Sequence, residues 1–163
     1  MDPLSVPTIL LLAAGGLCAG FVDSIAGGGG MIALPVLLTA GLPPHMALGT
    51  NKLQSSFGSF TATLNYARKG LVRPREMVWG IVATALGAGL GTLAIQQVSA
   101  TVLKGIIPVM LAVVFLYTLC SPDLGYSDTA PRLKKNLFYL VMGSLLGFYD
   151  GFFGPGTGSF WAL

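Results

Sequence analysis

The sequence predicts an all-α integral membrane protein, a polytopic helical bundle with glycine-broken helices and an internal repeat. Composition is the first reason: 53% of the 163 residues are hydrophobic, only 9% are charged, and the mean hydropathy is +0.77. A soluble domain usually carries about 25% charged residues. Glycine is also abundant, at 23 residues, as is typical of closely packed transmembrane helices. The chain therefore has too few charges to cover a surface that faces water.

Long charge-free runs predict the individual membrane segments. A bilayer core about 30 Å thick needs roughly 20 mostly apolar helical residues to cross it. Residues 3–22 carry no charged side chain, and neither do residues 77–98 or 105–122. The expected helical elements are residues 7–26, 31–41, 44–67, 77–97, 101–120 and 136–153, with an incomplete piece after the last of them.

The connections between these segments divide by charge. The loop 68–76 holds four Lys or Arg residues, the loop 121–135 holds three, and the connection 98–101 holds none. Positive residues collect on the cytoplasmic side of a membrane. We therefore expect both basic loops inside, residues 98–101 outside, and a multi-pass protein of the cell inner (plasma) membrane. Their position beside membrane segments explains the basic clusters, so no nucleic-acid partner is expected.

A self-match at an offset of 127 residues predicts an internal repeat. Residues 16–29 align with residues 143–156, and six of the fourteen positions are identical, including Asp23 with Asp150. Shared hydrophobicity would not readily place an aspartate at the same point of two apolar runs. We expect residues 1–135 to form a first repeat of about five membrane segments and residues 136–163 to begin a truncated second repeat.

The number of segments between the two copies decides their relative orientation. If residues 7–26 and 31–41 count as two segments, the number is odd and the second repeat is inverted, which is the arrangement we favour. If residues 7–41 form one broken span, the copies are parallel. Secondary transporters are often built from such repeats, and paired glycine- or proline-interrupted segments mark their binding sites.

Consecutive glycines interrupt the first apolar run at Gly27, Gly28, Gly29 and Gly30. Each glycine costs ~1 kcal/mol relative to alanine inside a helix, so four together should unwind it. Unwound backbone at membrane depth is tolerated where it is buried in protein or lines a watery cavity. The helix that follows would offer free N–H groups and a positive dipole end to an anion. Alternatively, the glycines only allow close helix crossing.

Asp23 and Asp150 each interrupt an apolar segment, and intramembrane ionisable groups are functional candidates. Three roles are open to them: carrying a coupling proton, pairing with Lys52, or capping the helix that follows the break. An aspartate on an anion pathway would repel the substrate, so gating or orientation suits it better than substrate binding.

Lys52 is the one strongly basic residue well inside an expected span. On a helix, Lys52 shares a face with Ser55, Ser56 and Ser59, and Asn51 lies beside them. This polar stripe could line a permeation path. The alternative is that it only holds helices together, through interhelical hydrogen bonds or a Lys52–Asp pair.

Three strings carry a family resemblance: GFVDSIAGGGG at 20–30, GTNKLQSSFGS at 49–59 and GFYDGFFGPGTGSF at 147–160. Together they resemble the sulfite exporter TauE/SafE family of membrane permeases. The resemblance implies two related halves that form one transporter for sulfite, sulfonates and related small organosulfur anions. It also implies a central pathway near Asp23, Gly27, Gly28, Gly29, Gly30, Asn51, Lys52, Gln54, Asp150, Gly154 and Gly156.

The chain is shorter than the pattern of this family, because a second-half match to residues 44–67 is missing. It is therefore expected to be a fragment, or a half that pairs with another chain or with itself. The expected function is secondary transport of a small anion across the lipid bilayer, with protons as a candidate coupling ion. The alternatives are a passive anion channel and a non-transporting half-subunit. No cofactor or metal is signalled, and the lack of a nucleophile–His–acid set argues against an enzyme.

Overall fold

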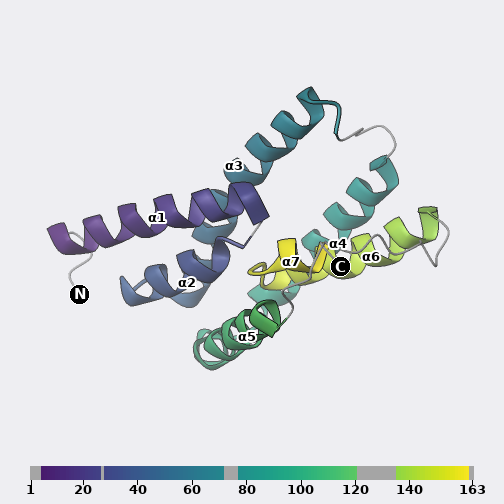
Figure 1. Ribbon diagram of the computed structural model, residues 1–163. Coiled ribbons are helices and arrows are strands. Elements are labelled where there is room, and N and C mark those ends of the chain that lie inside the picture. Colours follow the sequence, from purple (N-terminus) through teal and green to yellow (C-terminus); the bar gives the residue numbers. More distant parts are fainter. Residues whose placement is uncertain (1–4, 27, 72–76, 121–134, 162–163) are drawn as a thin grey trace.

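The computed structural model describes residues 5–26, 28–71, 77–120 and 135–161. These residues form helices and connecting turns and contain no strand, which confirms the all-α expectation (Figure 1). The helices are α1 (Val6–Ala26), α2 (Gly30–Thr39), α3 (Pro44–Arg68), α4 (Val78–Gln96), α5 (Ala100–Cys120), α6 (Lys135–Phe152) and α7 (Thr157–Trp161).

Three of these helices are long and apolar enough to cross a membrane: Val6–Ile25, Val78–Gln96 and Ala100–Cys120. The outer surface is correspondingly apolar, with Leu17 76% exposed and Phe57 70% exposed. Side chains of this size are normally buried in a soluble protein, whereas lipid is a suitable surrounding for them. The fold is that of a helical membrane protein.

The expected elements agree with the observed helices to within two residues at each end. The agreement follows from clear local signals, such as Pro44 at the first position of α3, where its fixed φ favours a helix start. Most of the two basic loops falls on residues 72–76 and 121–134, outside the described residues. Their cytoplasmic placement stays a prediction.

A small apolar core joins α1, α2, α3 and α5. It includes Ala19, Leu34, Ala47 and Ile107, each at most 1% exposed. Phe153, which directly follows α6, belongs to the same cluster and is 1% exposed. The second glycine-broken segment is therefore anchored in the core that the first one builds.

Helices α4 and α6 pack backbone against backbone through glycines, and Figure 1 shows them crossing. A Cβ atom added at Gly87 or Gly91 of α4 would collide with the backbone of α6, and one added at Gly151 would collide with the backbone at Ala88. Small residues permit this close approach in membrane helices. In α1, by contrast, nothing lies within 4 Å of a Cβ added at Gly16.

The first helices of the two repeat copies, α1 and α6, run in opposite directions in Figure 1, and their C-terminal ends point toward the middle of the molecule. The breaks that follow them meet there, because a Cβ atom added at Gly30 would lie 3.1 Å from Pro155 Cγ. Opposed first helices are what an inverted repeat requires. The inversion of whole repeats, and their bounds at 1–135 and 136–163, stay predictions.

Candidate functional site

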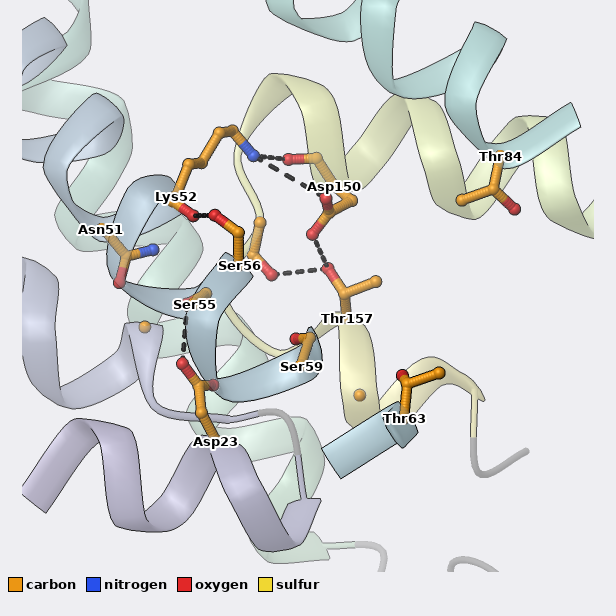
Figure 2. Close-up of a pocket in the computed structure, with 13 residues that line it drawn as sticks. Asp23, Asn51, Lys52, Ser55, Ser56, Ser59, Thr63, Thr84, Asp150 and Thr157 are labelled. Atoms are coloured by element: carbon orange, nitrogen blue, oxygen red, sulfur yellow. Dashed lines mark hydrogen bonds and ion pairs between the residues drawn. The ribbon is translucent and has the colours of Figure 1, made fainter. Parts of the chain in front are cut away.

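A cavity of about 730 Å³ lies where the two glycine breaks meet α3 (Figure 2). Its walls carry hydroxyls, one amide, one ammonium and two carboxylates, an unusually polar set for apolar helices. The lining residues are Asp23, Gly30, Asn51, Lys52, Ser55, Ser56, Ser59, Thr63, Thr84, Asp150, Gly154, Thr157 and Gly158.

Helix α3 supplies one whole wall of the cavity. Lys52, Ser55, Ser56 and Ser59 all line it, so the predicted polar stripe does face the interior. Thr63 extends the stripe by one further turn. Thr63 was not among the predicted residues, although it lies four residues after Ser59, where the helical period places it on the same face.

The Asp23 carboxylate accepts hydrogen bonds at the first glycine break. Its Oδ1 accepts a hydrogen bond from the Gly29 N–H at 2.7 Å, and its Oδ2 accepts one from Ser55 Oγ at 2.7 Å. The carboxylate is 8% exposed. Because Gly29 is the N-cap residue of α2 and brings no side-chain cap of its own, Asp23 takes over part of the capping. Of the three open roles, capping is the one that this geometry supports for Asp23.

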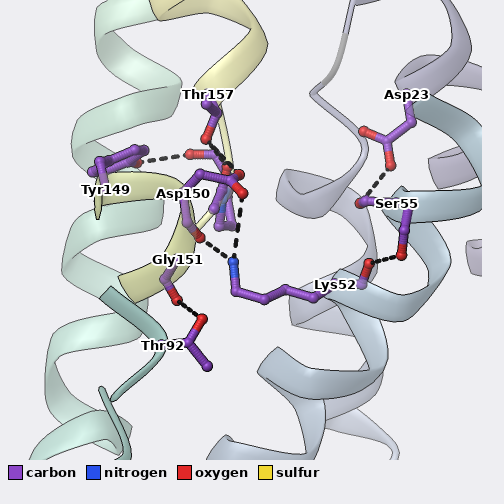
Figure 3. Close-up of polar contacts among 11 residues, drawn as sticks. Asp23, Lys52, Ser55, Thr92, Tyr149, Asp150, Gly151 and Thr157 are labelled. Carbon is purple, nitrogen blue, oxygen red and sulfur yellow. Dashed lines mark hydrogen bonds and ion pairs between the residues drawn. The ribbon is translucent and has the colours of Figure 1, made fainter. Parts of the chain in front are cut away.

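Asp150 occupies the matching place in the second break but has different partners (Figure 3). Lys52 Nζ donates to the backbone carbonyl of Asp150 and lies 3.9 Å from Asp150 Oδ2. The Thr157 hydroxyl lies 3.0 Å from Asp150 Oδ1 and 2.5 Å from the Gly154 carbonyl. The pairing role is therefore observed for Asp150, and it links α3 to α6.

Gly154 allows Lys52 to reach this position. Its φ is +97°, a conformation that side chains with a Cβ rarely adopt, and an added Cβ would lie 3.1 Å from Lys52 Nζ. The neighbouring turn is held by Tyr149, whose hydroxyl donates to the Pro155 carbonyl at 2.7 Å. Tyr149 and Thr157 were not among the predicted site residues, although both lie inside the string at 147–160.

Asn51, on α3, lies beside Gly30 at the start of α2 and is 3% exposed. Its Oδ1 is buried and has no hydrogen-bond partner, the one such side-chain atom found in the described part of the chain. Its Nδ2 would lie 3.0 Å from a Cβ added at Gly30. Buried polar atoms are nearly always paired in native proteins, so an unpaired one in a cavity wall indicates a place for a ligand or water.

The other predicted pathway residues lie behind this surface. Gln54 Nε2 donates to the Gly16 carbonyl at 2.9 Å, so Gln54 fastens α3 to α1 and does not reach the cavity. Gly28, Gly29 and Gly156 are buried and shape the two turns without lining the cavity. Gly27 lies outside the described residues.

Metal coordination has no candidate in the part of the chain that the structure describes, where no three His, Cys, Asp or Glu side chains gather. The lining side chains supply charge and hydrogen-bonding groups. Hydroxyls, an amide and an ammonium gathered among apolar helices make this cavity the candidate functional site of a membrane protein.

Comparison with known proteins agrees with this class. Residues 12–163 match the sulfite exporter TauE/SafE family, and the chain belongs to that family. It is 47% identical over 163 residues to a "Probable membrane transporter protein ORF9" of Sinorhizobium sp. It is 44% identical over 160 residues to a "Probable membrane transporter protein" of Haemophilus influenzae, and 42% identical over 163 residues to "Probable membrane transporter protein YfcA" of Escherichia coli K12.

The matches cover 98–100% of this chain but 60–63% of these relatives, so the chain spans about three fifths of their length. No solved structure matches the chain. The family and the printed names of these relatives are those of membrane transporters.

Proposed function

We propose that the protein is a secondary transporter of a small oxyanion of the sulfite or sulfonate type in the cell inner membrane. The observation that carries the proposal is the Lys52 ammonium, which projects into a polar cavity at the junction of two broken helices. An ammonium inside a membrane segment is costly unless it serves a partner or a permeating ion. The cavity position makes a permeating anion the natural second partner.

The surroundings of Lys52 suit an oxyanion. Ser59 presents a hydroxyl donor, and Asn51 can present its amide N–H₂ after rotation of the amide plane. The Ser55 and Ser56 hydroxyls donate to Asp23 and to the Lys52 carbonyl, and each can donate to an anion only by exchanging that partner. The N-terminal end of α2 adds a positive partial charge, which favours an anion. Sulfite and sulfonates carry several acceptor oxygens on one sulfur atom, so one such anion can accept bonds from more than one of these donors.

The junction of the two breaks favours a carrier over a permanently open channel. Discontinuous helices that meet at the bilayer midplane form the substrate sites of carriers, in which one repeat moves against the other. A passive channel would let the anion equilibrate without exchange. A non-transporting half-subunit would show no flux by itself and would need a second copy or another chain as its partner.

Counterflow in proteoliposomes tests the proposal with the whole protein, including any sequence that its gene encodes beyond residue 163. Vesicles loaded with unlabelled sulfite are diluted into radiolabelled sulfite. A carrier accumulates label transiently by exchange, a channel equilibrates without an overshoot, and empty liposomes set the background. An overshoot supports the proposal. Its absence, with the protein shown to be folded, rejects secondary transport of sulfite.

A further inference from the structure

The formal charge of the cavity wall opposes anion binding when every lining group is ionised. One ammonium, on Lys52, faces two carboxylates, on Asp23 and Asp150, so the lining carries a net charge of −1. Charges in a low-dielectric cavity interact strongly. Binding of an anion in this cavity is therefore favoured by the loss of a negative charge from its wall.

The two carboxylates are not equally able to lose their negative charge by taking up a proton. Asp23 is 8% exposed, and both of its oxygens accept hydrogen bonds of 2.7 Å from Gly29 and Ser55. A proton on Asp23 Oδ1 would remove the acceptor of the Gly29 N–H, and a proton on Oδ2 would weaken the bond from Ser55. The Asp150 side chain is 47% exposed, and only its Oδ1 accepts a hydrogen bond, from the Thr157 hydroxyl at 3.0 Å. Its Oδ2 lies 3.9 Å from Lys52 Nζ, beyond hydrogen-bond distance. The hydrogen bond of Lys52 goes to the Asp150 backbone carbonyl, which protonation of the side chain leaves in place.

Few other titratable groups face Asp150. From α3 it meets Lys52, and its neighbour Tyr149 on α6 directs its hydroxyl to the Pro155 carbonyl. The residues of α4 and of α7 include no Asp, Glu, Lys, Arg, His, Cys or Tyr. The remaining ionisable side chains of α3 and α5 do not line the cavity: they are His45, Tyr66, Arg68, Lys104, Tyr117 and Cys120.

We propose that Asp150 is a built-in counter-anion of Lys52 and that the substrate anion replaces it only when Asp150 takes up a proton. The inference rests on the proposed function and adds the coupling ion to it. The proton comes from the water on the side of entry, binds an Asp150 carboxylate oxygen, and leaves with the anion on the other side. Proton and anion thus travel together in the same direction, and Asp23 has a structural role only.

Proton uptake on anion binding tests this coupling in the detergent-solubilised whole protein. Isothermal titration calorimetry is run with methanesulfonate in buffers of different ionisation enthalpy, which reports the protons taken up per anion. Methanesulfonate is chosen because it does not itself titrate near neutral pH. We expect uptake approaching one proton per anion at high pH, with affinity falling about tenfold per pH unit there.

Asp150→Asn should bind methanesulfonate with no proton uptake and no pH dependence. The repeat-matched variant Asp23→Asn should keep the proton uptake, whatever its affinity. Wild-type binding without proton uptake overturns the coupling, and this result does not depend on the folding of any variant. Full proton uptake in Asp150→Asn also overturns the coupling. If the wild-type protein shows sulfite counterflow but takes up no proton with methanesulfonate, only the coupling is rejected. If it shows neither sulfite counterflow nor methanesulfonate binding, the proposed function itself is rejected.

Discussion

Asp23 and Asp150 stand at matching positions of the two repeat copies, yet α3 gives them different partners. Ser55 donates to Asp23 Oδ2 at 2.7 Å, and one turn earlier Lys52 lies 3.9 Å from Asp150 Oδ2. A single helix therefore bridges both glycine breaks. The difference between a hydroxyl and an ammonium gives the two aspartates different chemistry, although the sequence presents them as equivalents.

Asp23 should matter mainly for stability. Asp23→Ala removes the acceptor of the Gly29 N–H and of Ser55, and we expect a loss of about 2 kcal/mol in the free energy of unfolding. Ser24→Ala is the matched control, because it removes only the exposed bond from Ser24 Oγ to the Phe21 carbonyl. Thermal unfolding in detergent measures both. Equal shifts for the two variants would refute the capping role.

Asn51 should matter for anion binding and not for stability. Asn51→Leu replaces a buried amide that has an unpaired oxygen, so we expect unfolding stability to hold or rise. Methanesulfonate affinity should fall by roughly tenfold, as for the loss of one good hydrogen bond. Calorimetric titration and thermal unfolding measure the two quantities. A large loss of stability with unchanged affinity would make Asn51 a structural residue.

Gly154 should be sensitive to substitution for two reasons: its positive φ and the closeness of Lys52. Gly154→Ala places a Cβ at φ +97° and 3.1 Å from Lys52 Nζ. Gly41→Ala has the same backbone problem at φ +92° but meets nothing within 4 Å. Both should lose about 1–3 kcal/mol of stability through strain. Gly154→Ala alone should lose anion affinity, and equal affinities in the two variants would contradict the contact with Lys52.

Glycine packing between α4 and α6 can be tested within a single helix. A Cβ at Gly91 would strike the backbone of α6, whereas nothing lies within 4 Å of a Cβ at Gly89. Gly91→Leu should separate the two helices, with a loss of at least about 3 kcal/mol, and Gly89→Leu should be nearly neutral. Thermal unfolding and expression level distinguish them. A neutral Gly91→Leu would show that the crossing is not tight.

The helix positions could be predicted from the sequence because the signals that mark them are local. Charge-free length, glycine clusters and Pro44 mark the ends of segments whatever they later pack against. The sequence was also sufficient for the cavity-facing side of α3, because Lys52, Ser55, Ser56 and Ser59 share one helical face.

Contacts between distant segments could not be predicted in the same way. The helical period places Gln54 close to the polar stripe, but whether it faces the cavity or the Gly16 carbonyl depends on how α1 packs. Thr84 lines the cavity because α4 crosses α6, which no local pattern encodes. The choice of Asp150 over Asp23 as the partner of Lys52 likewise arises only when the two breaks meet.

The most direct test of the central claim, that Lys52 binds the transported anion, is sulfite counterflow in two lysine variants of the whole protein. Lys52→Gln removes the ammonium in the cavity, and Lys104→Gln removes an exposed one on α5 that does not line it. We expect the first variant to lose about 2 kcal/mol of anion binding, roughly thirtyfold in affinity, and the counterflow overshoot with it. The second variant should exchange sulfite like the wild type. Equal counterflow in both variants would contradict a role for Lys52 in anion binding.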